Sequence, residues 1–243
     1  MSKKVINQNA NYDSEILNSV ESNFIFDENP INRLEDAANN LKSGGDIDLI
    51  DKEKELNELK LQVNSIIDCD LKDYSKKIVL GDGNLNSPIM LVGEAPGIEE
   101  DSVGETFLGE VGDLLKKMLA AINIKKENIY STYAVNFRPP EDRKPTPKEI
   151  KRYSQFLQKQ ISIIKPKLII LMGSTAMESL TGLNSKISME RGKWKEVIVQ
   201  NTTYKIIITF NLSYLLRAPE NKKHSWEDLK KIKQKIIDLK LNI

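Results

Sequence analysis

Short apolar runs alternate with helix-like stretches along the chain from residue 78 onward. Four runs have the length and composition of buried strands: Ile89–Val92, Asn128–Val135, Leu168–Met172 and Lys205–Phe210. Apolar residues three and four positions apart predict helices over residues 111–122, 150–164, 174–180 and 225–239. Ser225 is expected to cap the last helix, with Trp226 in its first turn. This alternation predicts an α/β fold, a three-layer α/β/α sandwich around a mainly parallel four-stranded central sheet.

The first 77 residues differ from the rest of the chain in composition and in the periodicity of their apolar residues. Residues 1–50 are rich in Asn, Asp, Glu and Ser, contain the breakers Pro30 and Gly44-Gly45, and show no sustained periodicity. We therefore expect residues 1–50 to form an acidic, disordered extension. Apolar residues at helical spacing predict a helix over residues 51–68. We treat residues 51–77 as a helical lead-in to a domain that spans residues 78–243.

Composition excludes several kinds of site. The 243 residues contain one cysteine, Cys69, and one histidine. A disulfide framework, a four-thiolate site within one chain and a zinc site with two or three histidines are therefore excluded. No apolar run is long enough to span a bilayer, and the first residues do not resemble a signal region. We expect a cytoplasmic protein, nucleoid-associated if bacterial, with no membrane partner.

The net charge of the chain is +1, but acidic and basic residues are unevenly distributed between two parts of it. Residues 1–70 carry 7 Lys and Arg against 15 Asp and Glu, whereas residues 71–243 carry 29 against 20. A basic body with an acidic leader is typical of a domain that binds a polyanion such as nucleic acid. Ordinary solvated lysine faces are the alternative explanation of the same counts.

The predicted strand order nominates four loops as a candidate site. In open α/β sheets, ligands bind beyond the carboxyl ends of the strands. In this chain those ends lead into Gly93–Phe107, Asn136–Pro147, Gly173–Ser174 and Asn211–Pro219.

The first of these loops combines glycines with acids. Gly93 and Gly97 flank Ala95-Pro96 and let the backbone approach a ligand closely, but no phosphate-loop lysine follows. An acid at a strand end, such as Glu94, suits activation of water or stabilisation of a cationic transition state. A solvated acidic turn is the alternative.

Basic and apolar residues mark the second and fourth loops. Arg138, Arg143 and Lys144 can contact phosphates from a proline-stiffened loop, or can be solvated charges on a rigid connector. Leu215 and Arg217 can form a wedge for a base stack. Alternatively, Leu215 is a core residue of a short helix.

Motifs in and around these loops, in this order, resemble those of the family 4 uracil-DNA glycosylases. The resemblance covers roughly residues 65–240 and implies an α/β/α fold that flips uracil out of DNA and hydrolyses its N-glycosidic bond. The motifs that carry it are Gly93-Glu94-Ala95-Pro96-Gly97 with Glu100-Asp101, Gly104-x-x-Phe107-x-Gly109 with Gly112-x-Leu114-Leu115, Arg138-Pro139-Pro140 with Arg143, Arg191-Gly192, and Ser213-Tyr214-Leu215-Leu216-Arg217.

The resemblance also implies roles for individual residues. Glu94 aligns with the residue that handles water, Asp101 with the second acid of the motif, and Asn211 with the donor to the uracil anion. The implied base-binding residues are Gly93, Ala95, Phe107 and Tyr133, with Phe107 stacking on the flipped uracil. The implied DNA contacts are Arg138, Arg143, Ser213, Leu215, Arg217 and Lys222.

The chain departs from the family where the family binds iron. The family usually carries a [4Fe–4S] cluster on four cysteines, and the aligned residues here are Ile66, Cys69, Phe137 and Tyr153. One thiolate cannot hold such a cluster. We therefore expect no metal cofactor, and a packed apolar plug where the cluster would be.

Two further departures lie in the implied base pocket. Asn211 stands where the family has a histidine. It can donate an amide N–H but cannot carry a charge. Loss of the histidine donor can raise the activation barrier by about 2–4 kcal/mol. Tyr133 replaces an asparagine that reads the edge of uracil, and its bulk can narrow the pocket. Asn136 lies three residues further on, and strand alternation points it to the opposite face.

Two functions from different classes follow. The first is a monomeric N-glycosidase of base-excision repair that acts on uracil, or a related deaminated base, in DNA. The second is a DNA-binding or scaffold protein that kept the fold and lost the reaction. The first is the leading function, and the joint change at Tyr133 and Asn211 is the support for the second as the alternative.

Overall fold

A six-stranded sheet forms the centre of the structure, a computed structural model that describes residues 33–243, with side chains from Leu49 onward. In spatial order, the strands are β1 (Asp82–Gly83), β3 (Tyr130–Tyr133), β2 (Ile89–Gly93), β4 (Leu168–Met172), β6 (Thr202–Thr209) and β5 (Trp194–Val199). The four central strands are parallel, with Leu91 opposite Ser131 and Ile170. The predicted parallel core is therefore confirmed.

Two antiparallel strands at the edges extend the sheet from the predicted four strands to six. β1 pairs with β3, and β5 forms a hairpin with β6. β1 is only two residues long, and within β5 only Val199 is buried. The sequence contains no apolar run at either place, because an edge strand with an exposed face needs none.

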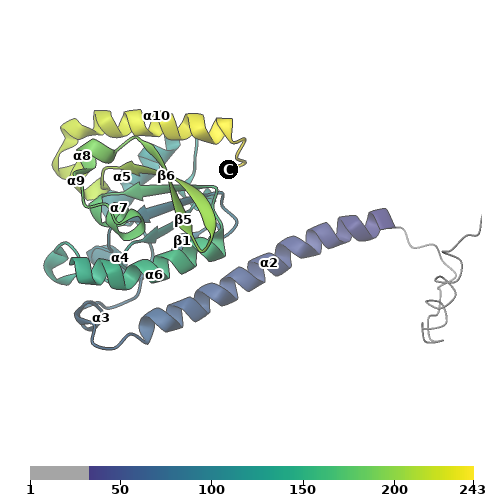
Figure 1. Cartoon of the computed structure of the whole chain (residues 1–243), viewed down its shortest axis with the longest axis horizontal. Helices are drawn as coiled ribbons and strands as arrows, with labels where there is room; N and C mark the ends of the chain where they lie inside the picture. The colour runs from purple at the N-terminus through teal and green to yellow at the C-terminus, as the bar shows by residue number, and fades with distance from the viewer. Residues whose placement is uncertain (1–32) are drawn as a thin grey trace, which may run out of the picture. The chain divides into compact units, whose positions relative to one another are not determined.

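Helices cover both faces of the sheet (Figure 1). On one face lie α5 (Gly109–Ala120), α9 (Leu212–Arg217) and α10 (Lys222–Asp238), and on the other lie α6 (Pro147–Ile164) and α7 (Ser174–Thr181). The remaining helices are α2 (Arg33–Asn64), α3 (Asp70–Tyr74), α4 (Ile98–Val103) and α8 (Ile187–Glu190), with 3₁₀ turns at Lys126–Asn128, Pro140–Asp142 and Pro219–Asn221. The predicted three-layer α/β/α sandwich is confirmed.

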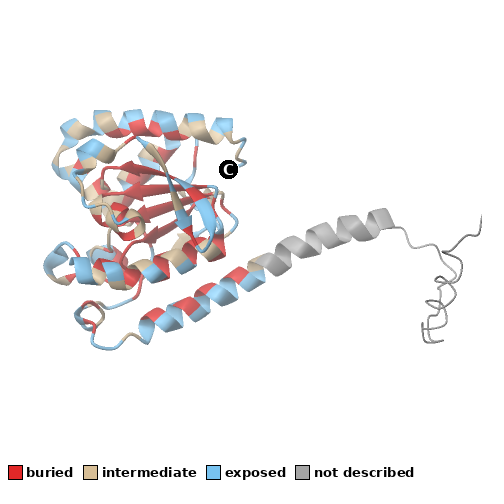
Figure 2. Cartoon of the chain, viewed as in Figure 1, coloured by how far each residue is buried: buried red, intermediate tan, exposed pale blue. Residues whose placement is uncertain are grey.

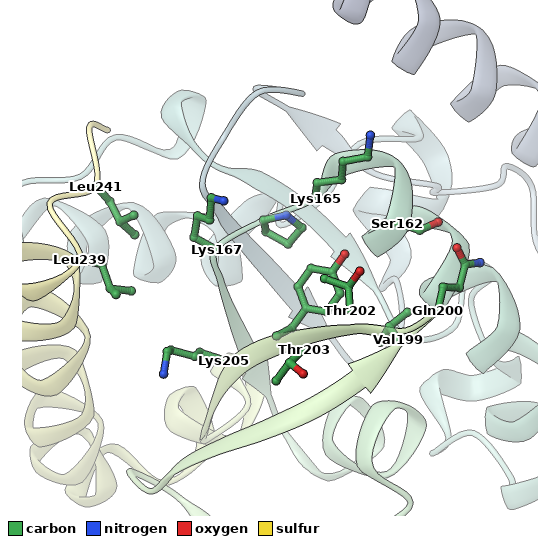
Figure 3. Close-up of a pocket in the computed structure, with 12 residues that line it drawn as sticks. Ser162, Lys165, Lys167, Val199, Gln200, Thr202, Thr203, Lys205, Leu239 and Leu241 are labelled. Atoms are coloured by element: carbon green, nitrogen blue, oxygen red, sulfur yellow. The ribbon is translucent and has the colours of Figure 1, made fainter.

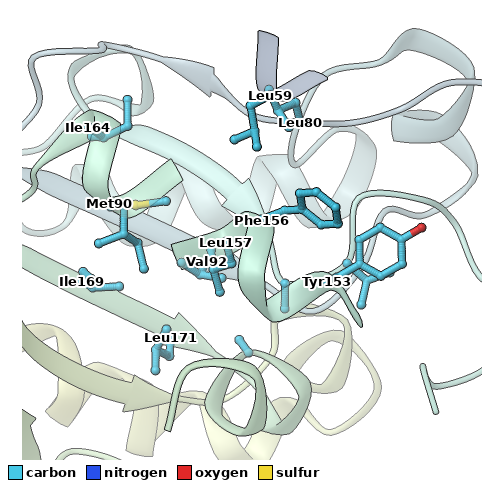
Figure 4. Packing of buried hydrophobic residues seen from close by; sticks show 14 of the residues in the cluster. Leu59, Leu80, Met90, Val92, Tyr153, Phe156, Leu157, Ile164, Ile169 and Leu171 are labelled. Atoms are coloured by element: carbon cyan, nitrogen blue, oxygen red, sulfur yellow. The ribbon is translucent and has the colours of Figure 1, made fainter. Parts of the chain in front are cut away.

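The central strands β2, β3 and β4 are buried along their whole length (Figure 2). Side chains on the two faces of the sheet belong to two separate core clusters. Along β2, Ile89 and Leu91 face α5 and α10, while Met90 and Val92 face α6. Figure 4 shows residues of the cluster that faces α6, including Met90 and Val92. This two-sided burial is why the parallel strands are continuous apolar runs in the sequence.

Helix ends agree with the local sequence at most positions. Thr146 and Glu149 form a capping box at the start of α6, and Gly182 ends α7 in a left-handed conformation. The last helix is present as predicted, but its predicted start and cap were wrong. α10 begins at Lys222, directly after a 3₁₀ turn, so Ser225 is buried inside the helix and does not cap it.

The amino-terminal helix is longer than predicted. α2 begins at Arg33 and so includes residues 33–50, which we expected to be disordered; residues 1–32 of that expected extension lie outside the described part. Leu56, Leu59 and Val63 pack into the core beside α6. Residues 51–64 therefore belong to the compact unit Gly45–Ile243. Among the described residues, no helix is long and apolar enough to cross a membrane.

Candidate active site

A cavity of about 540 Å³ lies where the carboxyl ends of the parallel strands meet the loops. It contains the implied residues from all three groups: base-binding, catalytic and DNA-binding. Its lining includes Gly93, Glu94, Ala95, Phe107, Tyr133, Arg143, Asn211, Ser213 and Arg217. The strand-end rule therefore located the cavity before any motif was considered.

The carboxylate of Glu94 is held by two different elements. Glu94 follows β2 directly, and its Oε1 accepts hydrogen bonds from Ser174 Oγ (3.1 Å) and Thr175 N (2.9 Å) at the amino end of α7. Its Oε2 accepts a hydrogen bond from Asn211 Nδ2. Backbone N–H groups at a helix start favour an anionic partner. These contacts fix the direction of the carboxylate at the cavity.

Gly173 makes room for this arrangement. It is the residue before α7, with φ of +103°, and a Cβ placed there would lie 2.5 Å from the carboxyl carbon of Glu94. Any side chain at this position would meet both an unfavourable backbone conformation and the Glu94 carboxylate. The glycine after β4 thus allows Glu94 to reach the start of α7.

Asn211 connects the helix α9 to Glu94. Its Oδ1 accepts a hydrogen bond from Ser213 N (3.1 Å) and caps α9, which directs the amide nitrogen toward Glu94. An amide nitrogen carries two hydrogens, and Glu94 accepts one of them. The other remains for a water molecule or a carbonyl oxygen in the cavity.

Tyr133 and Phe107 form the apolar wall of the cavity. Their ring centroids are 4.9 Å apart, and both side chains are buried. The Tyr133 hydroxyl accepts a hydrogen bond from Phe107 N (3.0 Å) and donates one to Glu100 Oε1 (3.3 Å). Burial and the nearby charge of Glu100 raise the pKa of Tyr133 well above its ordinary value. The phenol is therefore neutral and firmly held.

Tyr133 also lies directly against the backbone of the first loop. A Cβ at Gly93 would be 2.6 Å from the Tyr133 ring, so this glycine provides the space that the ring occupies. The side chain of Asn136 donates a hydrogen bond to Val79 O (3.1 Å) and is buried, and it does not line the cavity. As the strand pattern predicted, Asn136 does not take the place of the family's asparagine.

The structure corrects the role expected for Asp101. Its carboxylate is buried outside the cavity, where it accepts hydrogen bonds from Ser75 Oγ, Lys76 N (2.8 Å) and Lys77 N (3.3 Å). Glu100, the preceding residue, lines the cavity instead. The two acids are consecutive residues of α4 and therefore point in different directions. Asp101 holds the loop at residues 75–77 in place.

Two of the implied DNA-binding arginines are engaged in ion pairs. Arg138 binds Asp142 through two nitrogens (2.7 and 3.1 Å), and Arg143 binds Glu149 in the same manner (2.9 and 2.7 Å). The hydrogen bond from Arg143 lowers the pKa of Glu149 to about 2. Arg217 lies at the cavity and has no ion-pair partner among the described residues. It is therefore the most available of the three for a phosphate.

Leu215 is a core residue, which corrects its expected role as a DNA contact. It is fully buried within α9, and it packs with α5 and α10. Of the two interpretations given for Leu215, a wedge for a base stack and a core residue of a short helix, the second is therefore correct. Lys222 lies apart from the cavity, at the start of α10, beside Trp226.

Comparison with known proteins identifies the family. The profile of the Uracil DNA glycosylase superfamily matches residues 80–230, more than half of the chain. The chain belongs to the uracil-DNA glycosylase superfamily. It is 34% identical to a type-4 uracil-DNA glycosylase of Archaeoglobus fulgidus over 73% of this chain and 91% of that protein. It is 38% identical to one of Thermotoga maritima over 68% of this chain and 86% of that protein.

The chain is also similar to a small part of a longer protein. A DNA polymerase of Bacillus phage SP01 is 34% identical over 128 residues, which are 52% of this chain and 14% of that protein.

Four residues stand where the resemblance to the family 4 enzymes implies cluster ligands, and they do not fit a [4Fe–4S] cluster. Cys69 Sγ lies 3.2 Å from the Tyr153 hydroxyl, and the rings of Tyr153 and Phe137 meet edge to face at 6.2 Å. All three are buried, and Ile66 packs half-buried against the same apolar cluster. The plug predicted from the sequence is therefore confirmed. The described residues also contain no group of three or more His, Cys, Asp or Glu that could hold a metal.

Sequence reasoning missed the residues that hold Glu94. Ser174 and Thr175 bind its carboxylate, and Glu100 positions Tyr133. The strand-end rule did nominate the loop at Gly173–Ser174, so the region was available from the sequence. The contact of Ser174 and Thr175 with Glu94 could not be predicted, because short polar residues are common at the start of helices in any protein.

Proposed function

We propose that this protein is a uracil-DNA glycosylase that removes uracil, or a related deaminated base, from DNA in base-excision repair. The observation that carries the proposal is the contact between the Glu94 carboxylate and the Asn211 amide in a cavity that Phe107 also lines. The type-4 uracil-DNA glycosylases named above support it. We further propose that it acts as a monomer without a metal cofactor, on DNA in the cytoplasm or nucleoid.

The reaction places opposite demands on the two ends of the broken bond. As the bond between C1′ of the sugar and N1 of uracil breaks, its electron pair leaves with the base and positive charge builds on the sugar. The oxygen of a water molecule bonds to C1′, and the proton it loses goes to Glu94 or through it to solvent. The fixed negative charge of Glu94 orients this water and stabilises the cationic sugar.

Asn211 serves the departing base. Its remaining amide N–H can donate to a carbonyl oxygen of uracil, where negative charge develops. A neutral amide stabilises that charge less than an imidazolium would, so we expect a weak enzyme. Phe107 offers a ring on which the extrahelical base stacks.

A second function remains, and the position of Tyr133 favours it. The ring lies on Gly93 and Phe107 and is held by two hydrogen bonds, so it occupies part of the space in which a flipped base must fit. If that space is closed to uracil, the protein binds DNA without cleaving the glycosidic bond.

One assay separates the two functions. An oligonucleotide with a single uracil is incubated with excess protein and then treated with alkali, which breaks the strand at an abasic site. Slow, uracil-dependent cleavage supports the glycosylase, and an oligonucleotide with thymine at the same place is the control. Binding of the uracil oligonucleotide without any cleavage supports the DNA-binding protein.

A further inference from the structure

The backbone of Phe107 has a conformation that bulky residues rarely adopt. Its φ is +51°, in the left-handed region, which brings the Cβ of an L-residue close to the following carbonyl oxygen. The side chain is buried, and its ring lines the candidate active site. A residue persists in such a conformation only where its surroundings hold it there. The groups that hold Phe107 therefore decide where its ring lies.

Side chains from other elements bind every main-chain polar atom of Thr106 and Phe107. The carboxylate of Asp82 accepts hydrogen bonds from Thr106 N and from Thr106 Oγ1 (2.8 Å). The ammonium group of Lys126 donates to Thr106 O and, at 3.5 Å, to Phe107 O. Phe107 N donates to the Tyr133 hydroxyl (3.0 Å). These side chains replace the hydrogen bonds that a helix or a strand would otherwise provide.

Asp82 and Lys126 come from two elements next to β3. Asp82 is in β1, which pairs antiparallel with β3 and places Asp82 opposite Ser131. Lys126 begins the 3₁₀ turn Lys126–Asn128, which lies shortly before β3 in the chain. Both side chains are partly buried, and neither lines the cavity. The short strand β1 thus gives the loop before α5 a support that is fixed to the central sheet.

The main chain is also held after Phe107. Leu108 N donates a hydrogen bond to Glu100 Oε1 (3.0 Å). A Cβ on Gly112 would lie 2.1 Å from Phe107 O, so the first turn of α5 lies directly against this carbonyl group. The segment is therefore fixed before, at and after the residue whose ring forms the wall of the cavity.

We propose that Asp82 and Lys126 are positioning residues, which hold Phe107 in its left-handed conformation and so keep its ring in the wall of the cavity. Both act through the main chain of residues 106–107. Without them the loop can relax to an ordinary backbone conformation, and the ring leaves its place. The consequence for excision rests on the proposed function, in which the base stacks on this ring. A base without that support is poorly aligned with Glu94, and a small misplacement is costly in rate.

Amide hydrogen exchange of the full chain, followed by NMR, tests the holding of the loop directly. Asp82→Asn leaves one acceptor oxygen where two are used, and Lys126→Met removes the ammonium donor. In both variants, exchange at the N–H groups of Thr106 and Phe107 should accelerate at least about tenfold more than exchange at Ile170, because only the loop is released. Ile170 lies in the central strand β4 and reports on the stability of the core.

Two lysines are matched controls for the loss of a positive charge. Lys125→Met changes the exposed neighbour of Lys126. Lys167→Met changes an exposed lysine of a separate cavity, of about 600 Å³, which shares no lining residue with the candidate active site (Figure 3). Neither variant should change exchange at residues 106–107.

Thr106 offers a conservative pair of variants. Thr106→Ser keeps both donors to Asp82 and should exchange at Phe107 as the natural chain does. Thr106→Val has nearly the same shape but no hydroxyl group, and it should accelerate exchange at Phe107. A difference between the two shows that Asp82 acts through these hydrogen bonds.

The rate of excision measures what the position of the ring contributes to the reaction. On the uracil oligonucleotide under enzyme excess, Asp82→Asn and Lys126→Met should lower the maximal single-turnover rate at least about tenfold. The protein concentration that gives half of this rate should change less than about twofold, because contacts to phosphates supply most of the affinity for DNA. A variant that is merely less stable would not separate these two quantities.

Two results would overturn the proposal. One is exchange that accelerates no more at residues 106–107 than at Ile170, and the other is a maximal rate that stays unchanged although the loop exchanges faster. If the natural chain releases no uracil, the proposed function fails, and the exchange rates alone decide whether Asp82 and Lys126 hold Phe107.

Discussion

Tyr133 lines the cavity at the position where the resemblance to the family 4 enzymes implies an asparagine. The ring fills space beside Gly93 and Phe107, and its hydroxyl is committed to Phe107 N and to Glu100. A phenol fixed in this way cannot read the donor and acceptor edge of uracil as an amide can. Base recognition must therefore depend on the surrounding residues.

Replacing Tyr133 by asparagine should increase uracil excision by about fivefold, since a hydrogen bond to the base edge is worth about 1 kcal/mol. The measurement is the single-turnover rate on a uracil oligonucleotide. Tyr133→Ala is the matched control, because it opens the same space without supplying an amide. Equal rates for the two variants would show that space, and not an amide, limits the reaction.

The position of the Glu94 carboxylate depends on the start of α7, where Ser174 and Thr175 donate hydrogen bonds to it. Gly173 and Gly182 precede and follow this helix, and both have positive φ. A Cβ on Gly173 would strike the Glu94 carboxylate, whereas a Cβ on Gly182 would meet nothing within 4 Å. The two glycines thus differ in their surroundings, and both have a positive φ that disfavours other residues.

Gly173→Ala should therefore reduce excision at least about tenfold more than Gly182→Ala does, because only the first displaces the carboxylate. Both variants should lose stability through backbone strain. The melting temperature of each variant is therefore measured, and its loss of excision is compared with its loss of stability. A comparable loss of excision in both variants would indicate that only the stability of α7 matters.

Some of the secondary-structure elements and site residues could be predicted from the sequence, and others could not. The parallel strands were predictable because burial on both faces makes them apolar runs, while β5 was not, because most of its residues are partly or fully exposed. The cavity was predictable from the strand ends and the motifs. The choice between Glu100 and Asp101 was not, because adjacent acids in one helical turn differ only in direction. Leu215 likewise fits either a wedge or a core by its chemistry alone.

The chain as a whole has one cysteine, and so lacks the four thiolate ligands of the iron–sulfur cluster that the resemblance to the family 4 enzymes implies. Cys69, Phe137 and Tyr153 pack against one another at the aligned positions. The purified protein should be colourless and contain well below one iron per chain, measured by elemental analysis after expression with added iron. A brown protein with about four irons per chain would contradict this account.

Binding to DNA should depend on the basic body of the chain, and affinity should fall steeply as salt rises because counterions are released. Arg217→Ala should reduce the slope of log affinity against log salt by about 1, as expected when one phosphate contact is lost. Arg138→Ala should have a smaller effect, because Asp142 already compensates its charge. Filter binding at several salt concentrations measures both. Affinity that does not change with salt would refute the electrostatic explanation.

The most direct test of the central claim is the release of free uracil, measured by mass spectrometry, from a uracil-containing oligonucleotide under enzyme excess. We expect slow release by the natural chain and release at least about a hundredfold slower by Glu94→Gln, since the group that orients water is lost. Glu105→Gln changes an exposed acid of the same loop, outside the cavity, and should leave the rate unchanged. No release by the natural chain at any enzyme excess, or equal rates for Glu94→Gln and the natural chain, would contradict the account.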